Sequence, residues 1–243
     1  MMNHFPKSLV VTDQEIDLTT LSERQKFFTQ ELLTEIQAKY TTLNHPRMII
    51  GIAGPSGSGK SVLVALLKYL SQLEQEAHTV ETVGIDAYSY PNSLLSHTPV
   101  GTHTLKEVKG RYDTYNTTQL VNDLAHFRQG DTLMIPEYSR KIHDPVPSAK
   151  QIQDPNTLLL VEGLWILSDF PGWESVRNTF DFSYFLNGDQ TSLRTKTIAR
   201  HEAGGRSPKD AEQYYETVDA VNYDLVCNSA TKAHKLLPAF SLP

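Results

Sequence analysis

Apolar residues recur along this chain in two patterns. Short runs in which successive positions are apolar are typical of strands buried on both faces of a sheet. Longer stretches in which apolar positions recur every three or four residues predict helices. The predicted strands are 48–53, 80–85, 158–161 and 180–186, and the predicted helices are 22–40, 62–73, 118–128, 190–203 and 208–223.

Strands and helices therefore alternate. This order predicts a three-layer α/β fold, in which a parallel sheet of about five strands carries helices on both faces. The chain is expected to form a single domain, with residues 1–46 as an N-terminal helical extension. Ligands of such sheets bind beyond the carboxyl ends of the strands, so the residues that follow the strands are the first candidates for chemistry.

Two of the helices have start signals. Thr20 and Glu23 have the spacing of a capping box ahead of the first helix. Ser207 followed by Pro208 predicts the start of the last helix, because a serine caps well and a proline at the first helical position needs no N–H partner.

Composition narrows the class of protein. The 243 residues are 39% hydrophobic and 21% charged, as in an ordinary globular protein. The net charge of -6 does not favour nucleic acid as a partner. Cys227 is the only cysteine, which favours a reducing compartment. No apolar run approaches the roughly 20 residues of a membrane-spanning helix, and the N-terminus lacks the pattern of a secretory signal. We therefore expect a cytoplasmic protein with no membrane partner.

One segment carries a specific chemical signal. Residues 54–61 fit the pattern G-x-x-x-x-G-K-[ST] between a predicted strand and a predicted helix, which is the context of a phosphate-binding P-loop. Glycines let successive N–H groups converge on phosphate, the lysine adds charge near the β- and γ-phosphates, and the last hydroxyl can bind Mg²⁺. The residues expected to bind ATP are Gly54, Pro55, Ser56, Gly57, Ser58, Gly59, Lys60 and Ser61.

A P-loop alone leaves GTPases and transport ATPases open. The segment 169–172 matches D-x-x-G, but it lies too far beyond the P-loop for a GTPase, and the chain has no N-K-x-D guanine-binding motif. It also has no L-S-G-G-Q signature. Asp86, by contrast, ends the second predicted strand beside the phosphate site. A carboxylate there can accept the proton of an attacking hydroxyl, so Asp86 is the candidate general base.

Further motifs follow in order. They are Tyr112-Asp113, then Pro136-x-Tyr138-x-Arg140-x-x-His143, and then a strand that ends in Val161-Glu162-Gly163. With the P-loop and Asp86, they resemble the uridine kinase, phosphoribulokinase and pantothenate kinase group over about residues 47–233. The later part of the chain looks most like small bacterial sugar (fructose-type) or uridine kinase-like proteins, on the evidence of Trp173 and of the segments 180–181, 201–207 and 222–226.

The resemblance implies roles for individual residues. Asp86 matches the family's general base, and Glu162 matches a carboxylate that helps Ser61 to hold Mg²⁺. Arg200 and Arg206 match arginines of a lid, here about residues 190–210, that closes over the phosphates. The expected acceptor-binding residues are Asp86, Arg111, Tyr112, Tyr138, Arg140 and His143.

Two departures weaken the expectation of uridine itself. Uridine kinases usually follow the base with Ser/Ala-Phe-Tyr, where this chain has Ala87-Tyr88-Ser89, and their paired Arg-Asp of the lid is Arg200-His201 here.

Other residues are interpreted as structural. Trp165 and Trp173 are expected to pack in the core, and Tyr214, Tyr215 and Val218, at helical spacing, to cover the sheet. The histidines lack metal-ligand spacing, so no structural zinc is expected.

The sequence thus predicts a kinase that uses ATP and Mg²⁺ to phosphorylate a hydroxyl of a small metabolite, such as a nucleoside, a sugar or a pantothenate-like acid. The catalytic residues would be Asp86, Lys60, Arg200 and Arg206. The alternative is an NTP-binding regulatory or assembly protein that hydrolyses ATP slowly and has no such acceptor. The acceptor and the oligomeric state stay open, and a homodimer is compatible with both readings.

Overall fold

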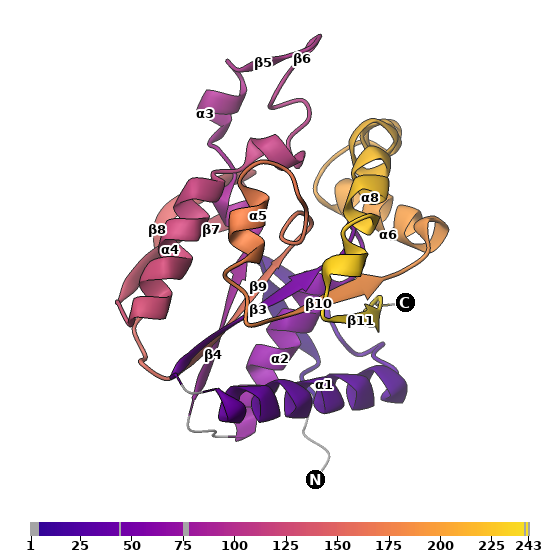
Figure 1. The fold of residues 1–243 in the computed structure, drawn as a ribbon. Coiled ribbons are helices and arrows are strands. Elements are labelled where there is room, and N and C mark those ends of the chain that lie inside the picture. Colours follow the sequence, from indigo (N-terminus) through magenta and orange to yellow (C-terminus); the bar gives the residue numbers. More distant parts are fainter. Residues whose placement is uncertain (1–4, 44, 75–77, 241, 243) are drawn as a thin grey trace.

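A five-stranded parallel sheet forms the centre of the protein (Figure 1). The structure is a computed structural model that describes residues 5–43, 45–74, 78–240 and 242. The strands lie in the order β11-β10-β3-β9-β4, and all neighbours run parallel. The predicted three-layer α/β fold is confirmed. The strands of the sheet are β3 (Arg47–Ala53), β4 (Thr79–Gly84), β9 (Thr157–Gly163), β10 (Phe182–Asn187) and β11 (Lys235–Pro238).

Alternate side chains of the central strands enter two separate hydrophobic cores. Ile49 and Ala53 of β3 pack with the core on one face, whereas Ile50 and Ile52 pack with the core on the other. This alternation follows from the period of two residues along a strand. One core is covered by α1 (Glu23–Thr42) and α2 (Lys60–Glu74), and the other by α4 (Thr117–Gln129) and α5 (Trp173–Arg177).

The remaining helices lie near the end of the chain, except α3. Helix α6 (Gln190–Ala203) is followed by a nearly continuous helical segment that contains one π-helical stretch. Ser207 caps α7 and Pro208 occupies its first turn, as predicted. The elements are α3 (Asn92–Leu95), α7 (Pro208–Tyr214), the π-helix Tyr215–Asp219 and α8 (Ala220–Cys227), with short 3₁₀ helices at Ile85–Tyr88, Tyr112–Thr114 and Ala230–Lys232.

Three antiparallel hairpins were not predicted. Strand β8 is exposed or half-buried at nearly every position, so its sequence lacks the apolar alternation that marks a strand. The N-terminal extension is likewise not only helical, because it begins with a hairpin. The pairs are β1 (Ser8–Val11) with β2 (Gln14–Asp17), β5 (Pro99–Val100) with β6 (His103–Thr104), and β7 (Leu133–Ser139) with β8 (Asp144–Ile152).

The predicted cap of the first helix was wrong by two residues. Helix α1 begins at Glu23, so Thr20 lies outside it. Ser22 is the N-cap: its hydroxyl accepts a hydrogen bond from the Gln25 N–H at 3.3 Å, and the Gln25 side chain accepts one from the Ser22 N–H at 3.0 Å. This reciprocal pair is the capping box that the spacing of Thr20 and Glu23 suggested two residues earlier.

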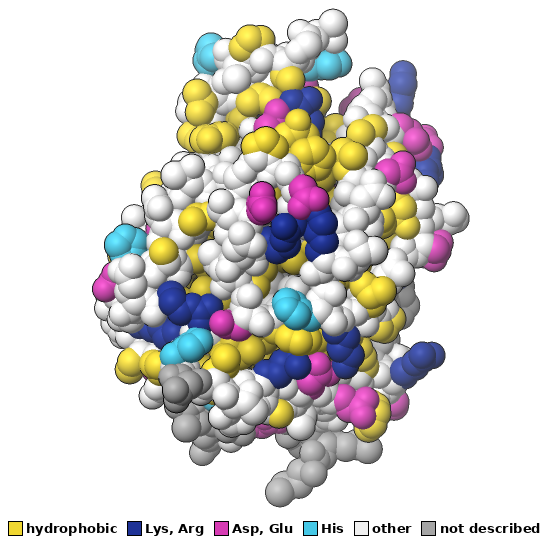
Figure 2. Space-filling view, in the orientation of Figure 1, with side chains coloured by type: hydrophobic (Ala, Val, Ile, Leu, Met, Phe, Trp, Pro, Cys, Tyr) yellow, Lys and Arg dark blue, Asp and Glu magenta, His cyan; other side chains and the backbone are white. Residues whose placement is uncertain are grey.

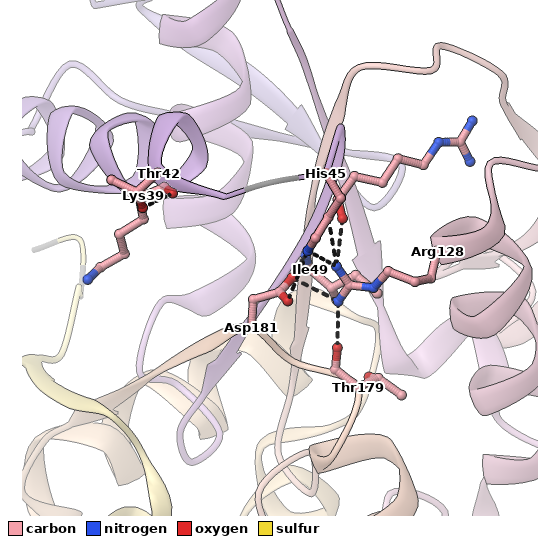
Figure 3. A network of polar contacts seen from close by, with 8 residues as sticks. Lys39, Thr42, His45, Ile49, Arg128, Thr179 and Asp181 are labelled. Carbon is pink, nitrogen blue, oxygen red and sulfur yellow. Dashed lines mark hydrogen bonds and ion pairs between the residues drawn. The ribbon is translucent and has the colours of Figure 1, made fainter.

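A polar network ties α4 to the start of the sheet (Figure 3). The Arg128 guanidinium donates to the Asp181 carboxylate at 2.8 Å and to the Arg47 carbonyl at 2.7 Å. Asp181 in turn accepts the Ile49 N–H at 2.7 Å. Because Asp181 precedes β10 and Ile49 lies in β3, the network fixes the register at which these neighbouring strands begin.

The face of the molecule seen in Figure 2 shows no extended field of one charge. Acidic and basic side chains intermingle over the face seen in Figure 2, in keeping with 22 basic and 28 acidic residues. In the described part of the chain, every helix is too short or too polar to cross a bilayer.

Candidate active site

The P-loop connects β3 to α2 and has no spare room. Gly57 and Gly59 have φ angles of +77° and +85°, which favour glycine. A Cβ atom on Gly59 would lie 1.7 Å from the Phe240 carbonyl oxygen, and one on Gly57 would lie 2.8 Å from the Thr197 hydroxyl. The loop is therefore clamped between the C-terminal segment and helix α6, and its conformation requires both glycines.

Lys60 is enclosed at the first turn of α2. Its side chain is buried, and the ammonium donates to the Pro55 carbonyl within the loop at 3.0 Å. Burial lowers the pKa of Lys60 to about 8; the nearby Arg200 lowers it too, while Glu162 and Asp86 oppose the shift. An anion placed in the loop would strongly stabilise this buried ammonium, whose described hydrogen bond goes to a neutral carbonyl.

Ser61 and Glu162 meet beside the loop. The Ser61 hydroxyl, in the first turn of α2, donates to the Glu162 carboxylate of β9 at 2.7 Å. Burial raises the pKa of Glu162, and the charge of Lys60 opposes that rise. One hydroxyl and one carboxylate fit Mg²⁺, which takes few protein ligands and completes its octahedron with phosphate and water. In keeping with this, no three His, Cys, Asp or Glu side chains converge among the described residues.

Asp86 lies just past the end of β4. The strand ends at Gly84, one residue earlier than predicted, and Asp86 occupies the following 3₁₀ helix. The buried Tyr115 donates to its carboxylate at 3.2 Å. Burial and the charge of Asp86 hold the pKa of Tyr115 well above its usual range, so the phenol stays a donor. Tyr115 thereby orients the carboxylate and leaves its other oxygen for a ligand.

A cleft of about 470 Å³ lies beside the P-loop, beyond the carboxyl ends of the strands. Asp86 lines it, as do residues of the P-loop, of the β7–β8 hairpin and of the lid. Six residues proposed from the sequence are brought together there with Ser56: Asp86, Tyr138, Arg140, His143, Arg200 and Arg206.

The β7–β8 hairpin carries three of these residues. Tyr138 is the penultimate residue of β7, and Arg140 and His143 occupy the turn. His143 has a φ of +52°, and its carbonyl accepts a hydrogen bond from Lys109 at 2.7 Å. Lys109 also pairs with Asp144 at 3.3 Å, so the turn is tethered to the segment between α3 and α4.

The lid arginines approach from the other wall. Arg200 lies near the end of α6, and Arg206 follows the Gly204-Gly205 turn. The Arg206 guanidinium lies 3.9 Å from the centroid of the Tyr214 ring, which holds it over the cleft. Both arginines line the same cleft as Ser56 of the P-loop.

Two residues proposed for the acceptor do not line the cleft. Tyr112 stacks on Phe170, with ring centroids 3.9 Å apart, and packs edge-on against Trp165. Arg111 forms an ion pair with Asp113. Trp165 and its fellow Trp173 are fully buried, as expected for packing residues.

The prediction for the last helix was wrong in part. Tyr214 and Val218 line the cleft instead of covering the sheet, and Asp219 and Asn222 join them. The π-helical stretch adds a residue to the turn and so rotates these side chains to one side, an effect that α-helical spacing does not anticipate. Asp219 accepts a hydrogen bond from His201 at 2.8 Å, which ties the lid to this segment.

Other residues that line the cleft could not be recognised as site residues from the sequence. Tyr115 and Lys109 flank the Tyr112-Asp113 motif but were assigned no role, and Gln14, Ser89 and Lys106 belong to no motif. Only the fold brings them to the cleft.

Comparison with known proteins identifies the family of the chain. The model of the phosphoribulokinase / uridine kinase family matches residues 49–239, which include every element of the cleft except the N-terminal hairpin. The chain belongs to this family. The family resemblance stated from the sequence is thereby confirmed.

Relatives within the family are similar over different lengths. The uncharacterized protein YggC of Escherichia coli (strain K12) is 30% identical over 229 residues, which are 94% of this chain and 93% of YggC. The pantothenate kinase of Streptococcus gordonii is 31% identical over 177 residues. That match covers 72% of this chain and 56% of the kinase, so the chain spans little more than half of that relative.

Solved structures share the fold. A protein of Silicibacter sp. TM1040, proposed to be a fructose transport system kinase, superposes with a TM-score of 0.76 over 86% of this chain and 98% of its own, at 20% identity. The D-glycerate 3-kinase of Cryptococcus neoformans superposes with a TM-score of 0.62 over 86% of this chain and 89% of its own, at 13% identity.

The lowered pKa of Lys60 predicts a pH-dependent affinity for ATP. Phosphate favours charged Lys60, so ATP binding should raise its pKa above about 8 and draw in a proton near that pH. Affinity should be full below pH 8 and should fall as pH rises through 8. Calorimetry at pH 8.5 in buffers of different ionisation enthalpy would measure the proton uptake. The Lys60→Arg variant, which stays charged, should show none. If the affinity of the wild-type protein for ATP does not change between pH 7 and pH 9, the prediction is contradicted.

Proposed function

We propose that this protein is an ATP-dependent kinase that transfers the γ-phosphoryl group to a hydroxyl of a small metabolite in the cytoplasm. The observation that supports it best is the position of Asp86. Its carboxylate, oriented by Tyr115 at 3.2 Å, faces the same cleft as the P-loop and the lid arginines. A protein that only binds or slowly hydrolyses a nucleotide needs no base held at this place.

The P-loop residues would bind the triphosphate of ATP. Their backbone N–H groups surround the phosphates, and Lys60 places its charge between them. Ser61 and Glu162 would hold Mg²⁺, which when bound neutralises charge on the β- and γ-phosphates. These residues mainly position the nucleotide, which accounts for much of the catalysis of phosphoryl transfer.

Asp86 would act on the acceptor. As the acceptor oxygen forms its bond to the γ-phosphorus, the bond from that phosphorus to the β,γ-bridging oxygen breaks and ADP leaves. The proton of the acceptor hydroxyl passes to Asp86. Arg200 and Arg206 would stabilise the charge that develops on the transferred group, since both line the same cleft as Asp86.

The alternative is a nucleotide-binding regulatory protein with slow hydrolysis. It accounts for the P-loop, but not for a cleft of about 470 Å³ beside it that is lined by Tyr138, Arg140 and His143. Named relatives and structural neighbours act on pantothenate and D-glycerate. Both compounds are small hydroxylated acids, so both belong in the first screen for an acceptor.

The Asp86→Asn variant should separate phosphoryl transfer from nucleotide binding. Asparagine keeps the size of the side chain but cannot take up the proton, so transfer to the acceptor should fall by about 10²–10⁴-fold. The affinity for ATP·Mg²⁺ should change little, because the P-loop is intact. Single-turnover transfer beside nucleotide calorimetry would measure both quantities.

Asp123→Asn is the matched control for this experiment. Asp123 also accepts a tyrosine hydroxyl, that of Tyr88 at 2.8 Å, but it lies outside the cleft, so the rate should stay within about twofold. An unchanged transfer rate in Asp86→Asn would show that Asp86 is not the base.

Arg200→Ala and Arg206→Ala should lower kcat more than the affinity for ATP. Their charge is of greatest use to the transition state, and each loss should cost about 10²–10³-fold in kcat. Arg194→Ala is the control on the same helix, because Arg194 pairs with Glu212 and Glu216 on the surface. Weaker ATP binding with kcat intact would make the two arginines ground-state ligands of the nucleotide.

A further inference from the structure

The N-terminal hairpin reaches the cleft although it lies outside the family match. That match begins at residue 49, whereas β1 and β2 span residues 8–17. Gln14, the first residue of β2, lines the cleft beside Asp86 and Arg140. This chain therefore adds a wall to the site from a segment that the common family fold does not include.

Asp13 in the turn of this hairpin holds the turn of the β7–β8 hairpin. Its carboxylate accepts hydrogen bonds from the Ser139 hydroxyl at 2.9 Å, the Arg140 N–H at 3.2 Å and the Lys141 N–H at 3.4 Å. These donors lie on three successive residues, so a single carboxylate fixes the backbone from which the Arg140 side chain projects. Hydrogen bonds to an ionised acceptor are the stronger kind.

The turn that presents Asp13 is strained. Thr12 and Asp13 have φ angles of +48° and +57°, and a β-branched residue rarely adopts such a value. Hairpin turns with two positive φ angles usually contain asparagine or glycine instead. The tip of the hairpin thus keeps an unfavourable backbone while its carboxylate contacts the neighbouring turn.

The cleft also contains more positive charge than a nucleotide requires. Among the described residues, five cations at the P-loop and cleft form no ion pair with a carboxylate: Lys60, Lys106, Arg140, Arg200 and Arg206. Lys60 and the two lid arginines suit the triphosphate. Lys106 and Arg140 remain, while Lys109 is already paired with Asp144. Arg140 is two residues from Tyr138, on the wall that faces Asp86.

We propose that Arg140 binds an anionic group of the acceptor and that Asp13 of the N-terminal hairpin positions it. The substrate would then be a hydroxylated carboxylic acid or a phosphorylated sugar, and not a neutral sugar or nucleoside. This inference rests on the proposed kinase function and names the substrate class for the same site. Arg140 determines specificity, and Asp13 is a positioning residue that touches no substrate.

Matched pairs of acceptors test the substrate class. Each pair shares a free hydroxyl and differs in whether it carries an anion: D-glycerate and glycerol, pantothenate and pantothenol, fructose 6-phosphate and fructose, and uridine 3′-phosphate and uridine. The best substrate should be an anionic member, with kcat/KM at least about 100-fold above that of its neutral partner. A neutral member that equals or exceeds its anionic partner as the best substrate would overturn the inference.

Variants test the residues with that best substrate. Arg140→Met should raise the KM of the anionic acceptor by about 10- to 100-fold and should remove the preference within the pair. Lys141→Met, the neighbouring cation outside the cleft, is its control and should leave both constants unchanged. Retained preference in Arg140→Met would overturn the role of Arg140.

Asp13→Asn isolates the positioning role. Asparagine tolerates a positive φ, so the turn is kept while the charged acceptor is lost. The KM of the anionic acceptor should rise by about 3- to 10-fold with the Kd of ATP·Mg²⁺ unchanged. The control is Glu15→Gln on the same hairpin, where Glu15 binds only Ser8 among the contacts described. A lower melting temperature with an unchanged KM would show that Asp13 is merely structural.

The same measurements separate this inference from the proposed function. If a neutral acceptor is phosphorylated well, the kinase function stands and the anionic class is wrong. If ATP·Mg²⁺ binds but no member of any pair receives phosphate, the result contradicts the proposed function, and this inference falls with it.

Discussion

The buried ammonium of Lys60 is the constraint around which the site is built. An ammonium removed from water at the first turn of a buried helix is costly unless negative charge lies close by. Glu162 and Asp86 supply part of that charge, and their opposing effects on the pKa of Lys60 show that the three groups interact. A bound polyphosphate would supply further negative charge, so we expect the loop to favour an anionic ligand over water.

The sheet brings these groups together. Parallel strands end at one edge, so the P-loop after β3, Asp86 after β4 and Glu162 at the end of β9 become neighbours although they lie far apart in the chain. Close packing then limits the loop, since Gly59 leaves no space for a side chain against Phe240. The other walls of the cleft are hairpins and the lid, which do not belong to the sheet. The fold thus separates the segment that would hold phosphate from the segments that would contact an acceptor.

The parts of this arrangement that depend on local sequence could be predicted. A P-loop motif between a buried strand and a helix specifies its own backbone, and runs such as 158–161 identify central strands because both of their faces are apolar. The position of Asp86 followed from the end of such a strand. The three-layer fold then followed from the order of the elements.

The parts that could not be predicted depend on contacts between segments that are distant in the sequence. Strand β8 is mostly exposed and has no apolar alternation, so the hairpin that carries Arg140 was not recognised. The contact of Asp13 with that hairpin spans more than 120 residues of sequence, and no local pattern anticipates it. The π-helical turn moved Tyr214 and Val218 from the sheet to the cleft. Tyr112 matched a family motif, yet the fold gave it an aromatic stack with Phe170 and gave the neighbouring Tyr115 the contact with Asp86.

The fate of the γ-phosphoryl group tests the central claim most directly. ATP labelled in that group is mixed with excess enzyme, Mg²⁺ and the pooled hydroxylated acceptors, and the products of a single turnover are separated. The account predicts that the label leaves ATP in an acceptor-dependent reaction and appears in an organic phosphate ester. Label that appears only as inorganic phosphate, at a rate independent of the acceptors, would contradict the assignment as a kinase and favour a nucleotide-hydrolysing regulatory protein.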